Sequence, residues 1–103
     1  MKYELIILLN AEFSEEQIDV IIKKYEEYIN KNNGEFIGAE KWGKRHLMGV
    51  SKSHKYTTEA YYVMINFEDT KHQLDKLNYK MKIDEEIIRH MISRKVEEQV
   101  VAS

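Results

Sequence analysis

The stretch KWGKRHL, residues 41–47, gathers basic side chains around one tryptophan and one glycine. Lysine and arginine bind phosphate oxygens, and a neighbouring aromatic ring can either anchor a strand by packing or stack on a base. Residues 34–56 carry five basic and two acidic residues, a local charge of +3, whereas the whole chain has a formal charge of −2. This segment is therefore the candidate anion-binding region, and we expect Trp42 to be its packing anchor.

Other residues that could do chemistry are scattered. The four histidines lie on separate segments and show no i, i+4 pairing of the kind that binds a metal on a helix. The carboxylate run Asp84-Glu85-Glu86 is expected to form a solvated turn, and the sequence shows no Ser-His-Asp arrangement and no glycine-rich nucleotide loop. Cysteine is absent, which excludes thiolate metal sites and disulfides. We therefore expect no enzymatic activity, no cofactor and no metal.

The first half of the chain predicts a strand and a helix. Residues 3–10, YELIILLN, are apolar on both alternating faces, as is typical of a central strand covered on each side. Ser14 with Gln17 forms a capping-box pattern, and the apolar residues that follow repeat at helical spacing. Asn33-Gly34 should end this helix, with Gly34 in the left-handed conformation.

The second half predicts three further strands and another helix. Residues 35–53 contain three glycines and no helical stripe, which indicates a long strand that bends or bulges. Residues 60–67 form a strand, Thr70 with Gln73 repeats the capping-box pattern before a short helix, and residues 86–95 form the last strand. Residues 53–59 are expected to be a polar turn.

The element order is therefore βαββαβ, within a single domain over residues 1–95 followed by a short polar tail over residues 96–103. Right-handed crossovers place both helices on one face of a four-stranded antiparallel sheet, the α+β ferredoxin-like arrangement. In this arrangement the first and third strands are central and the second and fourth are edges. The apolar N-terminal run is too short to span a membrane, so no membrane association is expected.

The sheet should leave one apolar face uncovered. A contiguous apolar patch on a small domain commonly marks a partner site, although long lysine and tyrosine side chains can also cover such a surface. The basic residues of the second strand are either ordinary protection of an edge or contacts to phosphate or to a partner strand. If no bulge intervenes, Lys44 and His46 project to one face and Arg45 and Leu47 to the other.

Several segments resemble one known family, the bacterial-type ribosomal protein six of the small subunit. They are YELIILLN, the helix after it, KWGKRHLMGVSK, YYVMIN and IDEEIIRHMISRK, which together cover roughly residues 2–95. The more specific matches are Trp42-Gly43-x-Arg45-x-Leu47 and Ile87-x-Arg89-x-Met91. The resemblance implies a non-enzymatic ferredoxin-like domain that pairs with ribosomal protein eighteen and binds the central domain of small-subunit rRNA. It also implies a location on the ribosome, in a bacterial cytoplasm or an organelle matrix.

On this hypothesis the candidate site residues fall into two groups. The expected RNA-binding residues are Lys2, Lys44, Arg45, Lys52, Lys55, Arg89 and Arg94. The expected partner-binding residues are Tyr3, Trp42, Leu47, Tyr61 and Tyr62. A chain of charge −2 with one small basic region can neutralise few phosphates, so it should need a basic protein partner to hold RNA tightly.

Three alternatives share this topology. An RRM-like module binds single-stranded RNA on aromatic residues of its central strands, and AYYVMINF lacks the usual Gly-aromatic-x-aromatic spacing. An acylphosphatase-like enzyme needs a phosphate loop, but the turn NAEFSEE has no glycine and is acidic. The topology also allows an ACT-like oligomer that senses a small molecule. The ribosomal hypothesis, in contrast, predicts no small-molecule substrate.

Overall fold

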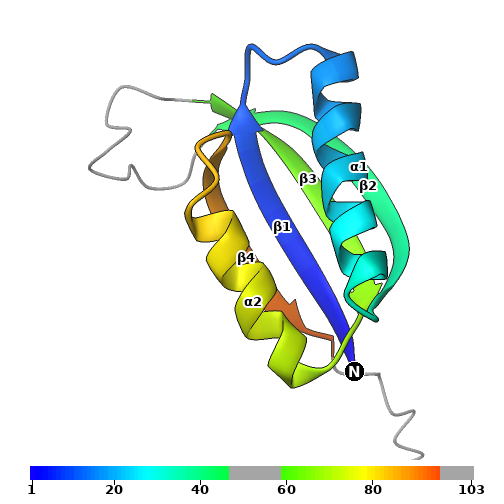
Figure 1. Cartoon of the computed structure of the whole chain (residues 1–103). Helices are drawn as coiled ribbons and strands as arrows, with labels where there is room; N and C mark the ends of the chain where they lie inside the picture. The colour runs from blue at the N-terminus through cyan, green and yellow to red at the C-terminus, as the bar shows by residue number, and fades with distance from the viewer. Residues whose placement is uncertain (47–58, 96–103) are drawn as a thin grey trace, which may run out of the picture.

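The structure, a computed structural model, describes residues 1–46 and 59–95, except for the side chains of residues 71 and 72. Within these ranges the elements follow the predicted order (Figure 1). They are β1 (Lys2–Asn10), α1 (Glu15–Lys31), β2 (Glu35–His46), β3 (Glu59–Glu68), α2 (Lys71–Lys82) and β4 (Ile87–Arg94).

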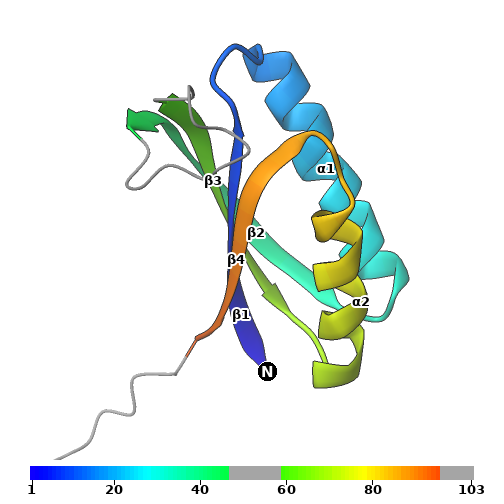
Figure 2. The same ribbon diagram turned by 90° about the vertical axis from the view of Figure 1, so that its left-hand side faces the viewer.

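The four strands form one antiparallel sheet in the order β2-β3-β1-β4. Both helices pack on the same side of this sheet, as the side view shows (Figure 2). β1 and β3 are therefore central and β2 and β4 are edges, which confirms the predicted ferredoxin-like architecture. Among the described residues, no helix is both long and apolar enough to cross a membrane.

The hydrophobic core lies between the helices and one face of the sheet. Every second residue of β1 and of β3 points into it, and α1 contributes side chains at helical spacing, as the two periodicities predict. The fully buried large side chains are Leu5, Ile7, Leu9, Ile18, Tyr25, Ile29, Val63, Ile65, Phe67, Leu77 and Met81.

Helix α1 begins as predicted and ends differently. The Ser14 hydroxyl accepts a hydrogen bond from the backbone N–H of Gln17 at 3.2 Å, and the Gln17 side chain accepts one from the backbone N–H of Ser14 at 2.8 Å. At the other end Asn33, not Gly34, has a positive φ of 69°. Asparagine tolerates the left-handed region better than most residues. Gly34 is needed for space instead, since an added Cβ would lie 2.8 Å from Cγ2 of Ile29.

Helix α2 has only half of the predicted capping box. The Thr70 hydroxyl accepts a hydrogen bond from the backbone N–H of Gln73 at 3.3 Å. The Thr70 backbone N–H donates to Oδ1 of Asp69 at 2.7 Å, so the Gln73 side chain is not used for it. Because the preceding residue supplies a nearer acceptor, the reciprocal bond does not form, and Oε1 of Gln73 is buried without a partner among the described residues.

Strand β2 bulges twice, as its glycines indicated. Its register against β3 shifts between Phe36 and Gly38 and again between Lys41 and Gly43. Trp42 therefore has no directly paired residue on β3. Gly43 has a φ of 81°, a conformation that glycine adopts at little cost and other residues rarely adopt. The second bulge thus lies within the basic segment and sets the direction of Trp42.

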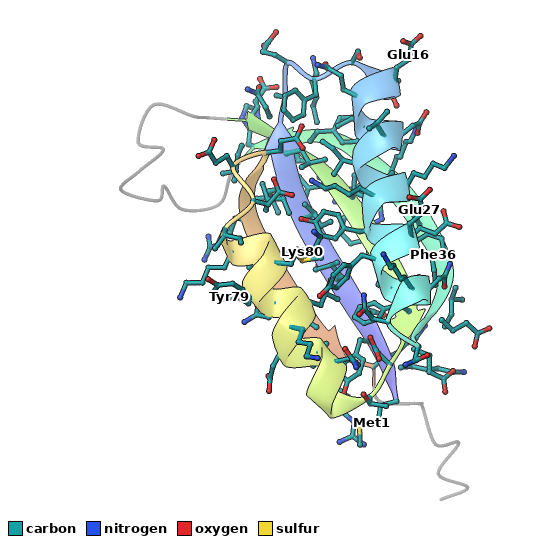
Figure 3. The ribbon with its side chains drawn as sticks, viewed as in Figure 1. Met1, Glu16, Glu27, Phe36, Tyr79 and Lys80 are labelled. Carbon is teal, nitrogen blue, oxygen red and sulfur yellow. The ribbon has the colours of Figure 1, made fainter. Side chains whose placement is uncertain are left out.

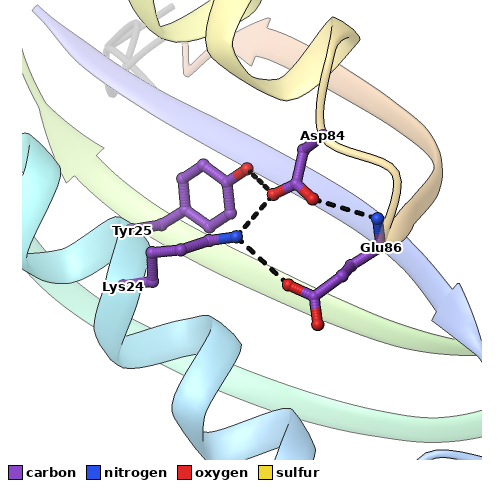
Figure 4. A network of polar contacts seen from close by, with 4 residues as sticks. All are labelled: Lys24, Tyr25, Asp84 and Glu86. Carbon is purple, nitrogen blue, oxygen red and sulfur yellow. Dashed lines mark hydrogen bonds and ion pairs between the residues drawn. The ribbon is translucent and has the colours of Figure 1, made fainter.

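A polar network joins α1 to the turn between α2 and β4 (Figure 4). Oδ2 of Asp84 accepts hydrogen bonds from the Tyr25 hydroxyl at 2.5 Å and from Nζ of Lys24 at 2.6 Å. Nζ of Lys24 also lies 3.3 Å from Oε1 of Glu86. The expectation of a solvated turn is wrong for Asp84, whose side chain is only 11% exposed. It holds for Glu85, which is exposed.

Candidate partner and RNA interface

The sheet face opposite the helices, called the open face here, carries an apolar row across its middle. The register places Met64 of β3 and Met91 of β4 on either side of Ile6 of β1, with Glu40 of β2 next to Met64. Met91 is 56% exposed, and Ile6 and Met64 are half-buried. An exposed methionine on a strand adapts readily to a partner surface, because its side chain is flexible and polarizable.

A second row on the open face lies beside the first. The register places Leu8 of β1 between Tyr62 of β3 and Arg89 of β4. Leu8 is buried and Tyr62 is half-buried, while Arg89 is exposed. The two rows together form what we call the apolar strip, which consists of Ile6, Leu8, Tyr62, Met64 and Met91.

One end of the open face is basic. Arg45 pairs with Ala60 at the end of β2, and its guanidinium carbon lies 5.0 Å from the centre of the Trp42 ring. The Trp42 indole N–H donates a hydrogen bond to Oε2 of Glu40 at 3.1 Å. These contacts fix the ring in place, so Trp42 serves as an anchor that holds Arg45 in a cation–π contact.

Part of the positive charge counted in the sequence is neutralised by α1. Nζ of Lys41 forms an ion pair with Asp19 and lies 3.2 Å from Oε2 of Glu15. The hydrogen bond to Asp19 raises the pKa of Lys41. The Tyr61 hydroxyl also donates to Glu15, at 3.1 Å. Lys41 thus fastens β2 to α1, and its positive charge is neutralised there. The positive charge available at the edge of the open face is therefore smaller than the charge counted along the sequence.

The structure separates the predicted RNA-binding residues. Arg45 and Arg89 lie at the same end of the open face, on opposite edge strands.

The other predicted RNA-binding residues do not join them. Lys44 pairs with Tyr61 and so projects to the helix side of the sheet, and His46 does too, as the alternation predicted. Arg94 pairs with Tyr3, also on the helix side, and Lys2 lies beside Glu68 at the far end. Two further candidates, Lys52 and Lys55, lie outside the described residues.

The predicted partner-binding residues also divide. Tyr62 and Trp42 are half-buried and belong to the open face or its rim. Tyr3 and Tyr61 are only 4% and 6% exposed and lie in the core, so their assignment to a partner surface is corrected. Both point toward the helices, because they share the alternation of the core residues in β1 and β3. Leu47 lies outside the described residues.

The sequence analysis did not select the four non-aromatic members of the apolar strip as site residues. Ile6, Leu8, Met64 and Met91 occupy the strand positions that alternate with the core residues. That alternation was visible in the sequence and could have identified them, once the core face was assigned.

The histidine of β4 lies away from the open face. The described residues contain no group of three or more His, Asp or Glu side chains that could hold a metal ion. His90 lies on the helix side of β4, where Nε2 is 2.7 Å from Oδ1 of Asn78 and burial lowers the pKa of the imidazole. His90 is therefore part of the packing between α2 and β4 and does not reach the open face.

Most of the chain matches one known protein family. The family model described as "Ribosomal protein S6" matches residues 2–94. The small ribosomal subunit protein bS6 of Heliobacterium modesticaldum is 33% identical over 97 residues, covering 94% of this chain and 98% of the relative. The bS6 protein of Dictyoglomus turgidum is 34% identical over 92 residues, covering 89% of this chain and 92% of the relative.

The fold has a counterpart among solved structures. The crystal structure of 30S ribosomal protein S6 from Thermotoga maritima superposes with a TM-score of 0.77, with 22% identity, covering 91% of this chain and 86% of that one. The match supports the ferredoxin-like arrangement of strands and helices. Taken with the family model and the curated relatives, it leads to one conclusion: the chain belongs to the ribosomal protein S6 family and is a structural, non-enzymatic protein of the ribosome.

Proposed function

We propose that the chain binds small-subunit rRNA in the central domain as a heterodimer with ribosomal protein eighteen, and so supports subunit assembly and translation. The observation that carries this proposal is the open face, where an apolar strip ends at two arginines. The apolar strip suits a protein partner, and the arginines suit phosphate. We place the partner on the strip and the RNA at the basic end.

The protein partner is supported by the burial pattern. Packing against another protein would remove Met91 and the half-buried Ile6, Met64 and Tyr62 from water. Fully burying one large apolar side chain contributes about 1.5–3 kcal/mol, so these residues can supply much of a stable interface. Glu40 on the rim complements a basic partner.

The RNA contact is supported by charge but limited by it. Arg45 and Arg89 can neutralise about two phosphates, which corresponds to a salt slope of only about −1.4 to −1.8. Such a slope gives weak binding at physiological salt, because affinity for RNA is built from many phosphate contacts. A basic protein on the apolar strip would add the missing contacts, which is why we propose a joint RNA surface rather than an autonomous one.

An RRM-like role is less well supported by the same face. Its bases would stack on aromatic side chains of both central strands. Here β3 presents Tyr62 to the open face, whereas β1 presents Ile6 and Leu8. One tyrosine beside aliphatic side chains is suited to protein packing. An ACT-like ligand sensor has no particular observation in its favour.

Reconstitution tests the proposal. The chain is mixed with ribosomal protein eighteen and a central-domain rRNA fragment, and complexes are resolved by native electrophoresis. Met64→Asp should abolish heterodimer formation, because it places a charge in the apolar strip. The matched control is Val20→Asp, since Val20 is 69% exposed on the helix side. Equal loss with both variants, or tight RNA binding by the chain alone, would count against the proposal.

A further inference from the structure

The outer surface of α2 exposes apolar side chains beside α1. Tyr79 and Ile83 are 64% and 62% exposed and lie one helical turn apart. Together with Tyr28 of α1 they line a shallow groove of about 530 Å³, whose remaining lining residues are Asp75, Lys76 and Lys80. Figure 3 shows Tyr79 extending outward from α2 and Lys80 on the side of α2 that faces α1.

Among the residues that the structure describes, no carboxylate pairs with the two lysines of the groove. Lys76 and Lys80 are four residues apart, a spacing at which like charges on a helix repel. Nζ of Lys80 lies 4.9 Å from the centre of the Tyr28 ring. Within the described part of the chain, neither ammonium is in an ion pair, whereas Lys24 and Lys41 each contact two carboxylates. A bound anion would remove the repulsion between Lys76 and Lys80.

The groove lies on the helix side of the molecule, opposite the open face. The helices cover one side of the sheet (Figure 2). The residues of the apolar strip alternate with the core residues along their strands, so the strip lies on the other side. A ligand in the groove therefore does not compete with a ligand on the open face. The two surfaces can be occupied at the same time.

We propose that this groove binds an acidic, amphipathic peptide segment of another protein. Its apolar side chains would pack on Tyr28, Tyr79 and Ile83, and its carboxylates would pair with Lys76 and Lys80. Grooves with an apolar floor and charged rim bind amphipathic helices in this way.

The charges favour a peptide over RNA. Two lysines would give an RNA salt slope of only about −1.4 to −1.8, which corresponds to too few phosphate contacts to hold RNA at physiological salt. The lining is mainly side-chain carbon of two tyrosines and an isoleucine, which suits aliphatic side chains with interspersed carboxylates. The proposal concerns a surface separate from the open face and stands independently of the proposed function.

Binding is tested by NMR titration of the labelled full chain. The probe is a synthetic helical peptide of about 14 residues, four turns, with leucine on one face and glutamate beside it. A twin peptide carries glutamine in place of glutamate, and a uridine octamer is the third ligand. The glutamate peptide should shift the signals of Tyr79 and Ile83 and leave the Trp42 indole on the opposite face unchanged. The glutamine twin should bind more weakly, and added salt should weaken the glutamate peptide.

Matched variants keep the result interpretable. Tyr79→Ala should lower the affinity for the glutamate peptide about tenfold, as expected for an aromatic anchor. Lys76→Glu should lower it about fivefold, and the control Lys23→Glu, an exposed lysine of α1 outside the groove, should not change it. Absence of binding, equal binding of the glutamine twin, or shifts with the uridine octamer alone would overturn the proposal. Reconstitution with rRNA is not affected by any of these outcomes.

Discussion

The hydroxyl oxygen of Tyr25 lies 2.5 Å from Oδ2 of Asp84, a residue 59 positions further along the chain. The same carboxylate oxygen accepts a hydrogen bond from Lys24, so α1 is tied to the turn that leads into β4 (Figure 4). Burial and the adjacent carboxylate raise the pKa of Tyr25, which keeps its hydroxyl protonated as a donor. This contact fixes the start of the strand that carries Arg89 and Met91.

Asp84→Asn should destabilise the protein by about 1–3 kcal/mol at pH 7, because a hydrogen-bonded, charged acceptor is lost. Burial opposes ionisation of Asp84, but hydrogen bonds from Lys24 and Tyr25 outweigh it and hold the pKa of the carboxyl below its ordinary value of 3.8. The folded pKa is thus lower than the unfolded one. The stabilisation is therefore present above about pH 4 and lost as the pH falls through the folded-state pKa.

Urea unfolding at several pH values checks this prediction. The difference in unfolding free energy between the original chain and Asp84→Asn should narrow as the pH is lowered from 7 toward 3. Glu85→Gln is the matched control, since Glu85 is exposed and should change stability by less than about 0.5 kcal/mol. A difference that stays constant over this pH range would contradict the role given to the Asp84 charge.

Gly34→Ala should cost about 1–3 kcal/mol, the usual penalty of an overpacked site. The added Cβ would lie 2.8 Å from Cγ2 of Ile29 and 2.9 Å from Oδ2 of Asp69, so one of these buried side chains must move. Gly38→Ala is the control, because no atom lies within 4 Å of a Cβ at that position. Thermal unfolding of the two variants should rank them clearly, and equal melting temperatures would show that the Gly34 site relaxes freely.

Tyr61→Ala should mainly lower the stability of the fold, whereas Tyr62→Ala should mainly weaken heterodimer formation, although the two residues are adjacent. Tyr61 is 6% exposed in the core, and its truncation should cost about 3–5 kcal/mol of stability. Tyr62 lies in the apolar strip, so Tyr62→Ala should leave the fold nearly intact and weaken heterodimer formation. Urea unfolding and native electrophoresis measure the two effects separately. A stable Tyr61→Ala, or a Tyr62→Ala that pairs normally, would refute the assignment of faces.

Arg45→Gln and Arg89→Gln should each reduce the salt slope of RNA binding by the heterodimer by about 0.7–0.9, the contribution of one phosphate. Filter binding over a range of potassium chloride concentrations measures the slope. Lys23→Gln, on the helix side, should leave it unchanged. If the two arginine variants keep the original slope, the basic end of the open face does not contact phosphate.

The order of elements and the start of α1 were determined by the sequence itself. Alternating and helical periodicities are local, and the Ser14–Gln17 capping box needs only residues three apart. Given these elements, the handedness of crossover connections leaves few ways to arrange one sheet and two helices. The bulged character of β2 was likewise visible in its glycines.

Other features were decided only by the tertiary structure. Asp84 is engaged rather than solvated because α1 brings Lys24 and Tyr25 to it from 60 and 59 residues away. Lys41 is neutralised by Asp19 on another element, so counting charges along the chain overstated the basic edge. Tyr3 and Tyr61 became core residues because the helices packed on their side of the sheet. Sequence alternation separates two faces of a strand, but when both are apolar, long-range packing decides which one is covered.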